Sequence, residues 1–319
     1  MQTAGYGHLA ERNLLTRKLT FWRVAAAVLA LAGIGALGLR LAGDDATHLG
    51  PHVARLRIEG VITDDKLMLK LVKDLEKSSA SAVILSVDSP GGTTTGAEAL
   101  YDELRRLAEK KPTVAVVDGV AASGAYIAAL AADGIVVRGN SIVGSIGVLM
   151  QMPNASKLME TVGVKMEEIK SSPLKAAPNP YEPVTPEARA ATAALIADSY
   201  QWFRKLVQDR RKMSDQELAN VADGRVFTGR QGVGLRLADR IGGEREAIAW
   251  LETERGVKKD LPVRDWKRPR RIDRLDLLGV AAGWLGLEDV ANILAPIGNI
   301  ALRRKLDGLQ AVWQGPQID

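Results

Sequence analysis

Cysteine is absent from the sequence. Its absence excludes disulfide bonds, metal sites built from thiolates and a cysteine nucleophile. The chain also lacks a strong excess of one charge: the net charge is +5, and basic and acidic residues are mixed through most of its length. A broad surface for nucleic acid is therefore not predicted.

Histidine is scarce. The chain has three, His8, His48 and His52, and none follows residue 52. A serine hydroxyl needs a base to become a nucleophile, and that base is usually histidine. If the globular part holds a catalytic serine, we expect its base to be a lysine that burial keeps uncharged.

The length of 319 residues and the 46% of hydrophobic residues suit one large α/β domain with appendages. The predicted parts are a cytoplasmic N-terminal segment (1–20), a transmembrane anchor (21–42), a linker (43–52), a globular domain (53–257) and a basic linker with an apolar C-terminal extension (258–319). Three placements stay open for the extension: packing on the domain, docking on a neighbouring subunit, or resting on a membrane surface.

The anchor is predicted from an uncharged run over residues 24–39. This run is short for a membrane span, but Arg23 and Arg40 can extend their charged ends to the interface and so lengthen it. Basic residues precede the segment, which places the N-terminus in the cytoplasm and the domain outside. The alternative is a cleaved signal sequence.

The central part alternates between short apolar strands and amphipathic helices. Strands with few polar residues favour a mostly parallel sheet covered by helices on both faces, and ligands of such sheets bind beyond the carboxyl ends of the strands. Strands are predicted at 53–58, 83–87, 113–117 and 135–137, and helices at 64–77, 96–109, 123–132 and 185–210, with a capping box at 214–217.

Ser123 follows a predicted strand and a tight turn at Gly119, and it stands where a helix begins. Unpaired backbone N–H groups at a helix start can stabilise a developing oxyanion, so Ser123 is a candidate nucleophile. The alternative is a serine whose hydroxyl only caps the helix.

Two further features support a catalytic site. The turn over residues 89–92 contains Gly91 and Gly92, whose backbone can approach a ligand closely; the alternative is an ordinary Pro-Gly turn. Lys175 stands among Leu, Ala and Pro, seven positions from the nearest acidic residues. Such a lysine is a candidate base, although most lysines are simply solvated.

Five motifs in this order resemble the signal peptide peptidase SppA family of serine proteases, in its short single-repeat form, on the ClpP/crotonase fold. The resemblance covers residues 53–255, and its motifs are Asp88-Ser-Pro-Gly-Gly92, Ala121-Ala-Ser-Gly124, Gly144-Ser-Ile-Gly-Val148, Lys170-Ser-Ser-Pro-Leu-Lys175 and the segment 222–230.

The resemblance implies a membrane-anchored endopeptidase with Ser123 as nucleophile, Lys175 as general base and Ser145 near the lysine. It implies that Gly91, Gly92 and Gly124 surround the oxyanion, and that the enzyme needs no cofactor and no metal. We expect Lys175 in a dry pocket without carboxylates. The expected partners are peptides such as signal-peptide remnants, the membrane, and other copies of the chain in a ring or dome with shared sites.

Two rival functions remain. A crotonase-like acyl-CoA enzyme would share the fold and use paired backbone N–H groups on a thioester oxygen, without a Ser/Lys pair. A scaffold subunit of a membrane complex would perform no chemistry. Binding of acyl-CoA would reveal the first, and labelling of Ser123 by a serine-reactive probe would count against the second.

Overall fold

The computed structural model describes residues 21–25, 28, 50–267 and 310–312. It divides the chain into two compact units, Met1–Gly50 and Pro51–Asp319. Residues 21–25 and 28 of the first unit are helical. Most of the predicted anchor, 21–42, lies outside the described residues. Within the described part, no helix is long and apolar enough to cross a membrane.

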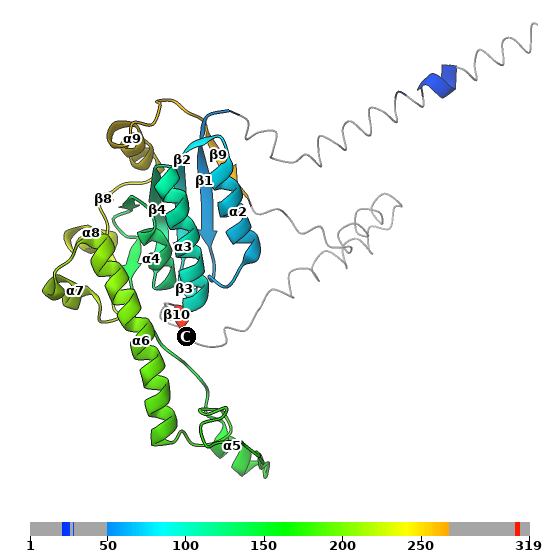
Figure 1. The fold of residues 1–319 in the computed structure, drawn as a ribbon, viewed down its shortest axis with the longest axis vertical. Coiled ribbons are helices and arrows are strands. Elements are labelled where there is room, and N and C mark those ends of the chain that lie inside the picture. Colours follow the sequence, from blue (N-terminus) through cyan, green and yellow to red (C-terminus); the bar gives the residue numbers. More distant parts are fainter. Residues whose placement is uncertain (1–20, 26–27, 29–49, 268–309, 313–319) are drawn as a thin grey trace, which may run out of the picture. The chain divides into compact units, whose positions relative to one another are not determined.

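A sheet of eight strands forms the centre of the second unit (Figure 1). Six strands follow the order β7-β6-β4-β2-β1-β9, while β5 pairs with β4, and β8 with β5. Every pairing is parallel except that of β6 with β7. The predicted mostly parallel α/β architecture is confirmed. The strands are β1 (His52–Glu59), β2 (Ala80–Ser89), β4 (Thr113–Ala122), β5 (Gly134–Val137), β6 (Ile142–Gly144), β7 (Val226–Thr228), β8 (Arg240–Ile241) and β9 (Val263–Trp266).

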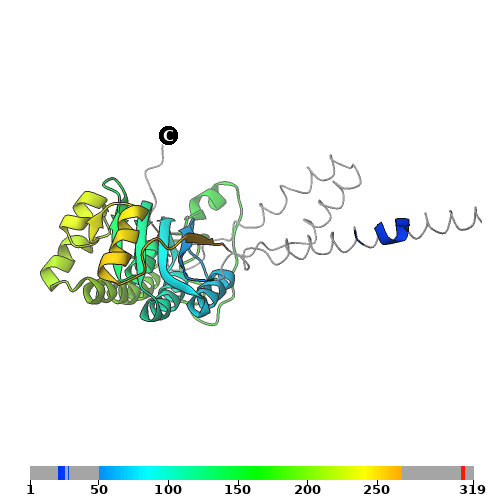
Figure 2. The ribbon, with the colours of Figure 1, turned by 90° about the horizontal axis from the view of Figure 1, so that it is seen from above.

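Helices cover both faces of this sheet. Figure 2 shows the blue and teal helices α2 and α3 on one side of the strands and the gold helix α9 on the other. The helices are α2 (Lys66–Lys77), α3 (Thr94–Lys110), α4 (Gly124–Leu130), α5 (Ser156–Thr161), α6 (Pro186–Arg211), α7 (Asp215–Val221), α8 (Gly229–Gly234) and α9 (Glu244–Glu254).

Alternating side chains of the strands fill two cores. In β2, Leu85 and Val87 pack in the larger core with α2, α3, α4 and α6, whereas Ala82 and Ile84 pack against Trp250 of α9. Successive side chains of a strand point to opposite faces, so a strand covered on both faces must be apolar throughout. This is why the strands read as continuous apolar runs.

Side-chain caps set where several helices begin. The hydroxyl of Thr185 accepts from the N–H of Ala188, and Ser214 forms a reciprocal capping box with Glu217, as the sequence predicts. Helix α3 begins at Thr94, earlier than expected, because the Thr93 hydroxyl accepts from the N–H of Gly96.

Two segments differ from expectation. Strand β4 does not stop before Gly119 but runs on to Ala122, and the Asp88 carboxylate accepts a hydrogen bond from the N–H of Val120 at 3.0 Å. Residues 263–266, expected in the basic linker after residue 257, form β9 at the edge of the sheet, where they pair with β1. Tertiary pairing places them in the sheet despite their charges.

A buried hydrogen bond of Tyr126 anchors helix α4, which follows Ser123, and its contribution to stability can be measured. Its side chain is fully buried, and its hydroxyl donates to the carbonyl of Leu237 at 2.8 Å. We expect Tyr126→Phe to lower the free energy of unfolding by about 1–2 kcal/mol, because the buried carbonyl loses its donor. Chemical denaturation measures this, with exposed Tyr181→Phe as the control, and an unchanged stability contradicts it.

The same residue gives a pH dependence. Burial raises the pKa of the Tyr126 phenol above its ordinary value. The unfolded chain therefore ionises this group first, at about pH 10, and its contribution to stability is complete below that pH and lost above it. We expect wild type to lose stability more steeply than Tyr126→Phe above pH 10. Parallel slopes would contradict this.

Candidate active site

The carboxyl ends of three neighbouring strands meet at one place. Ser89 of β2 is in register with Ala121 of β4, and Ala122 of β4 is in register with Gly144 of β6. Ser123 directly follows β4, and Ser145 directly follows β6. Two serines predicted from separate motifs therefore lie side by side beyond adjacent strand ends.

Ser123 adopts a conformation that side chains rarely tolerate. Its φ and ψ are 56° and −119°, and its N–H donates to the carbonyl of Gly144 at 2.8 Å. The residue is 1% exposed, and its hydroxyl makes no capping hydrogen bond to α4. The alternative of a merely capping serine is therefore wrong. Strained backbone of this kind concentrates at functional sites.

Ser145 is held in a similar way. Its φ is 52°, its side chain is buried, and its N–H donates to the carbonyl of Arg225 at 2.8 Å. Gly144 before it has a φ of 98°, and a Cβ there would come within 3.0 Å of the Phe227 ring. The segment 144–145 is thus fixed between β4 and β7, beside Ser123.

The three predicted glycines have different surroundings. The N–H of Gly91 donates to the Ser89 hydroxyl at 3.1 Å, and its carbonyl accepts from Ile62 at 2.8 Å. Its N–H is therefore already used, which weighs against a direct role at an oxyanion. Gly92 lies in β3 (Gly91–Thr93), which contacts α4. Gly124 is the first residue of α4, so its N–H has no acceptor within the helix.

Lys175 does not meet Ser123 within one chain. Its side chain is exposed and forms no ion pair in the part of the chain that the structure describes. Figure 1 shows its segment, near α5, leaving the core and lying at the far end of α6, whereas α4 stays in the core. The dry pocket expected around Lys175 does not form in the single chain, where this side chain is exposed.

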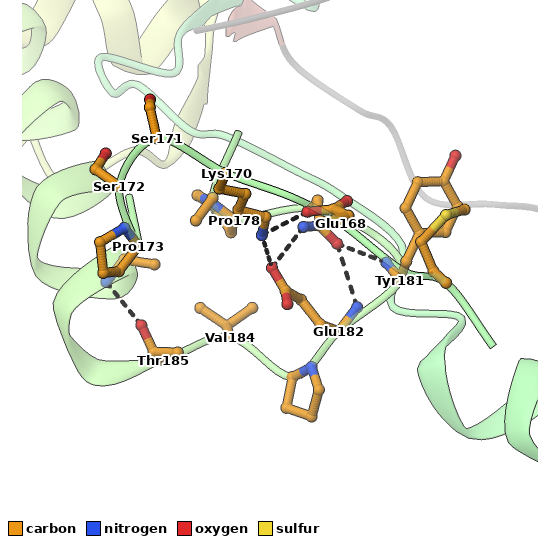
Figure 3. Close-up of a pocket in the computed structure, with 15 residues that line it drawn as sticks. Glu168, Lys170, Ser171, Ser172, Pro173, Pro178, Tyr181, Glu182, Val184 and Thr185 are labelled. Carbon is orange, nitrogen blue, oxygen red and sulfur yellow. Dashed lines mark hydrogen bonds and ion pairs between the residues drawn. The ribbon is translucent and has the colours of Figure 1, made fainter. Parts of the chain in front are cut away.

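A neighbouring lysine has a different environment. Lys170 forms ion pairs of 2.5 Å with both Glu168 and Glu182, and Figure 3 shows the three side chains converging. These carboxylates raise the pKa of Lys170, mainly through the hydrogen bond to Glu168. A lysine held charged cannot accept a proton, so Lys170 is the poorer candidate base.

The same segment encloses a hollow of about 720 Å³. It is lined by residues 166–188, among them Tyr181 and Val184 (Figure 3). Ser123 is not part of its wall. The hollow belongs to residues 149–195, which we call the projecting segment, and is separate from the strand ends that carry the serines.

His52 lies inside the fold rather than before it. It is the first residue of β1, fully buried, and its Nε2 accepts from Trp266 Nε1 at 3.1 Å. However, it stands at the amino end of a parallel strand, whereas Ser123 follows a carboxyl end. No histidine is thus near Ser123 in the described residues, and these hold no cluster of three or more His, Cys, Asp or Glu side chains suited to a metal.

Sequence reasoning missed two partners of β3. Ile62, outside the main strands, bridges to Gly92 on one edge. On the other edge, β10 (Gln310–Val312) pairs with β3 in antiparallel register. Both contacts join residues far apart in sequence, and neither short segment carries a motif. The apolar character of the C-terminal extension was the one available signal.

Comparison with protein families gives two overlapping matches. The model of peptidase family S49 matches residues 105–258, and the Clp protease model matches residues 59–139. A solved structure of a ClpP1 mutant from Listeria monocytogenes aligns with 60% of this chain and 92% of its own, at 14% identity and a TM-score of 0.41.

Curated relatives carry protease names. A Synechocystis sp. protein named "Putative protease" is 36% identical over 67% of this chain and 78% of its own length. "Serine protease SPPA, chloroplastic" of Arabidopsis thaliana is 30% identical over 71% of this chain and 34% of its own. "Protease 4" of Haemophilus influenzae is 28% identical over 67% of this chain. The chain therefore spans only about a third of the length of each of these last two relatives, 34% for the Arabidopsis protein and 36% for the Haemophilus protein.

The backbone of Ser123 gives a stability prediction. A positive φ costs a residue with a side chain about 1–3 kcal/mol, and glycine avoids most of this cost. We expect Ser123→Gly to be more stable to denaturant than Ser123→Ala by about 1 kcal/mol, since the greater freedom of glycine in the unfolded chain offsets part of the gain. A glycine variant less stable than the alanine variant would show that the site is not strained.

Proposed function

The chain belongs to peptidase family S49, and on that premise we propose that it is a membrane-anchored serine endopeptidase in which Ser123 and Lys175 act as a dyad. The observation that carries the proposal is the state of Ser123. Its backbone is strained, its hydroxyl does not cap α4, and Ser145 lies directly beside it. The protease names of the relatives support the same reaction.

The proposed reaction is acyl transfer. Lys175 accepts the proton of the Ser123 hydroxyl as its oxygen attacks the peptide carbonyl carbon. The lysine then gives this proton to the leaving amine as the C–N bond breaks. Water hydrolyses the acyl-enzyme and regenerates the hydroxyl. The N–H groups of Gly124 and Gly92 are the candidate donors to the oxyanion.

We place the two members of the dyad on different copies of the chain. Within one copy Lys175 is exposed and its segment lies apart from α4. A second copy that covered this segment would exclude water from the amine, and loss of water favours the uncharged form that a base requires. Ser145, beside Ser123, can accept a hydrogen bond from that amine and orient it.

Exposed apolar side chains support such an assembly. Exposed apolar side chains that gather on one part of a protein indicate an interaction surface. Most exposed large hydrophobic residues after residue 50 lie on the projecting segment: Leu149, Met150, Leu158, Val162, Val164, Met166, Ile169, Leu174, Tyr181 and Leu195. The surface that carries Lys175 is therefore the surface that most needs a partner.

The membrane anchor and the substrate complete the proposal. An anchor at 21–42 with basic residues before it would hold the protease domain on the extracytoplasmic side. Substrates would then be hydrophobic peptides such as signal-peptide remnants, bound in extended form at the strand ends.

A mixing experiment tests the shared dyad. Ser123→Ala and Lys175→Ala should each lower peptide cleavage by about 10³-fold or more. If the dyad joins two copies, an equal mixture of the inactive variants, allowed to reassemble, should recover about a quarter of wild-type activity. Half of the copies carry an intact Ser123 and half carry an intact Lys175, so in a head-to-tail assembly about one interface in four joins both residues. Fluorogenic peptide cleavage measures this.

The control is Lys165→Ala, an exposed lysine of the same segment, which should keep full activity. Two inactive single variants whose mixture stays inactive despite reassembly would place the dyad within one copy. Activity retained in either single variant would refute the dyad.

Orientation in the membrane is tested separately. In spheroplasts of cells that express the full chain, external protease should degrade the domain after residue 50 and leave an N-terminal tag protected. After lysis of the same cells, the protease should degrade both the domain and the N-terminal tag. Protection of the domain in intact spheroplasts would reverse the proposed topology.

A further inference from the structure

A short strand from the C-terminal extension lies against the candidate substrate site. Strand β10 pairs antiparallel with β3, with Gln310 opposite Thr93, Ala311 opposite Gly92 and Val312 opposite Gly91 (Figure 1). It also contacts α3 and α4. Helix α4 begins directly after Ser123, so this strand lies beside the helix that positions the candidate nucleophile.

Only one edge of β3 is committed to the fold. Ile62 donates its N–H to the carbonyl of Gly91 at 2.8 Å and accepts from the N–H of Thr93 at 2.9 Å. Backbone groups of successive residues in a strand point to alternate edges. The N–H and carbonyl of Gly92 are therefore directed to the opposite edge, which β10 covers.

This opposite edge has the properties of a peptide-binding site. An extended chain that adds to a sheet edge binds through backbone groups, so chains of different sequence can occupy the same edge. At Gly92 no side chain is tolerated, since a Cβ would lie 1.7 Å from the carbonyl oxygen of Ile62. The chain that pairs here therefore meets bare backbone.

The contact with β10 is of a kind that can be exchanged. The two strands form a separate two-stranded sheet, apart from the eight-stranded one. Each has three residues, and two-stranded pairings of this size are marginally stable without further strands. The main sheet therefore does not depend on β10.

We propose that residues 310–312 are an internal inhibitory strand, which occupies the edge of β3 in place of the substrate and must leave before a peptide can bind. This inference rests on the proposed function for the identity of the site, but it concerns binding at β3 and not the chemistry at Ser123. An extended peptide substrate would take the same antiparallel direction, with its backbone opposite Gly92.

The test compares two proline substitutions in the full chain. Ala311→Pro removes the N–H that faces Gly92, whereas Val312→Pro removes one that points away from β3. The probe is a fluorescein-labelled peptide with the sequence of residues 306–317, and its binding is followed by anisotropy. We expect about tenfold tighter binding to Ala311→Pro than to wild type if the strand covers the edge about nine-tenths of the time.

The matched variant Val312→Pro should bind the probe as weakly as wild type. Equal affinity of wild type and Ala311→Pro would overturn the proposal, as would equal gains in both proline variants. If Ala311→Pro does not fold, as judged by its thermal unfolding, a chain that ends after Gly308 replaces it, with the same expectation and the same contradicting result.

Binding and chemistry are separated by repeating the measurement in Ser123→Ala. The affinity difference should persist there, because the probe pairs with β3 and not with the hydroxyl. If the affinity difference is present but no peptide is ever cleaved, the proposal for residues 310–312 stands and the proposed protease function is refuted. If peptides are cleaved but the affinity difference is absent, the protease function stands and the proposal for residues 310–312 is refuted.

Discussion

The pairing of β4 with β6 is the constraint on which the candidate site depends. It sets Ala122 opposite Gly144, and the hydrogen bond from the Ser123 N–H to the Gly144 carbonyl continues the pairing by one residue. Ser123 is thereby kept in a conformation that a free serine would leave. Around it, α4 is buried along its full length, so the strain is balanced by the packing of an apolar helix.

The candidate base belongs to a different part of the molecule. Lys175 is carried by a segment that leaves the core; its side chain is exposed, and the same segment has many exposed apolar residues. Lys170, five residues earlier, is held charged by ion pairs with two carboxylates, whereas Lys175 has no such ion pair in the described part of the chain. In a single copy the two members of the proposed dyad therefore lie apart. Association between copies would bring Ser123 of one copy to Lys175 of another.

Strand β3 links substrate binding to the rest of the fold. Ile62 fixes one edge of it, and the N–H and carbonyl of Gly92 are directed to the other edge. In the structure that edge is covered by β10, a segment more than 200 residues away along the chain. The same geometry that suits an extended substrate suits the protein's own C-terminal extension.

The sequence by itself determined the architecture and the serines. Apolar strand runs indicated a parallel sheet covered on both faces, and Thr185 and Ser214 marked helix starts that the structure confirms. Motifs placed Ser123, Ser145 and Gly92 at strand ends. They could do so because a close backbone approach or a positive φ restricts the residue types that a position tolerates, and this restriction is visible in the sequence. Tertiary structure alone decided that β4 extends past Gly119, that residues 263–266 join the sheet, that Lys175 stays apart from Ser123 in one copy, and that β10 covers β3. Except for the position of Lys175, these outcomes depend on pairing between distant segments, and such pairing uses backbone groups that every sequence shares.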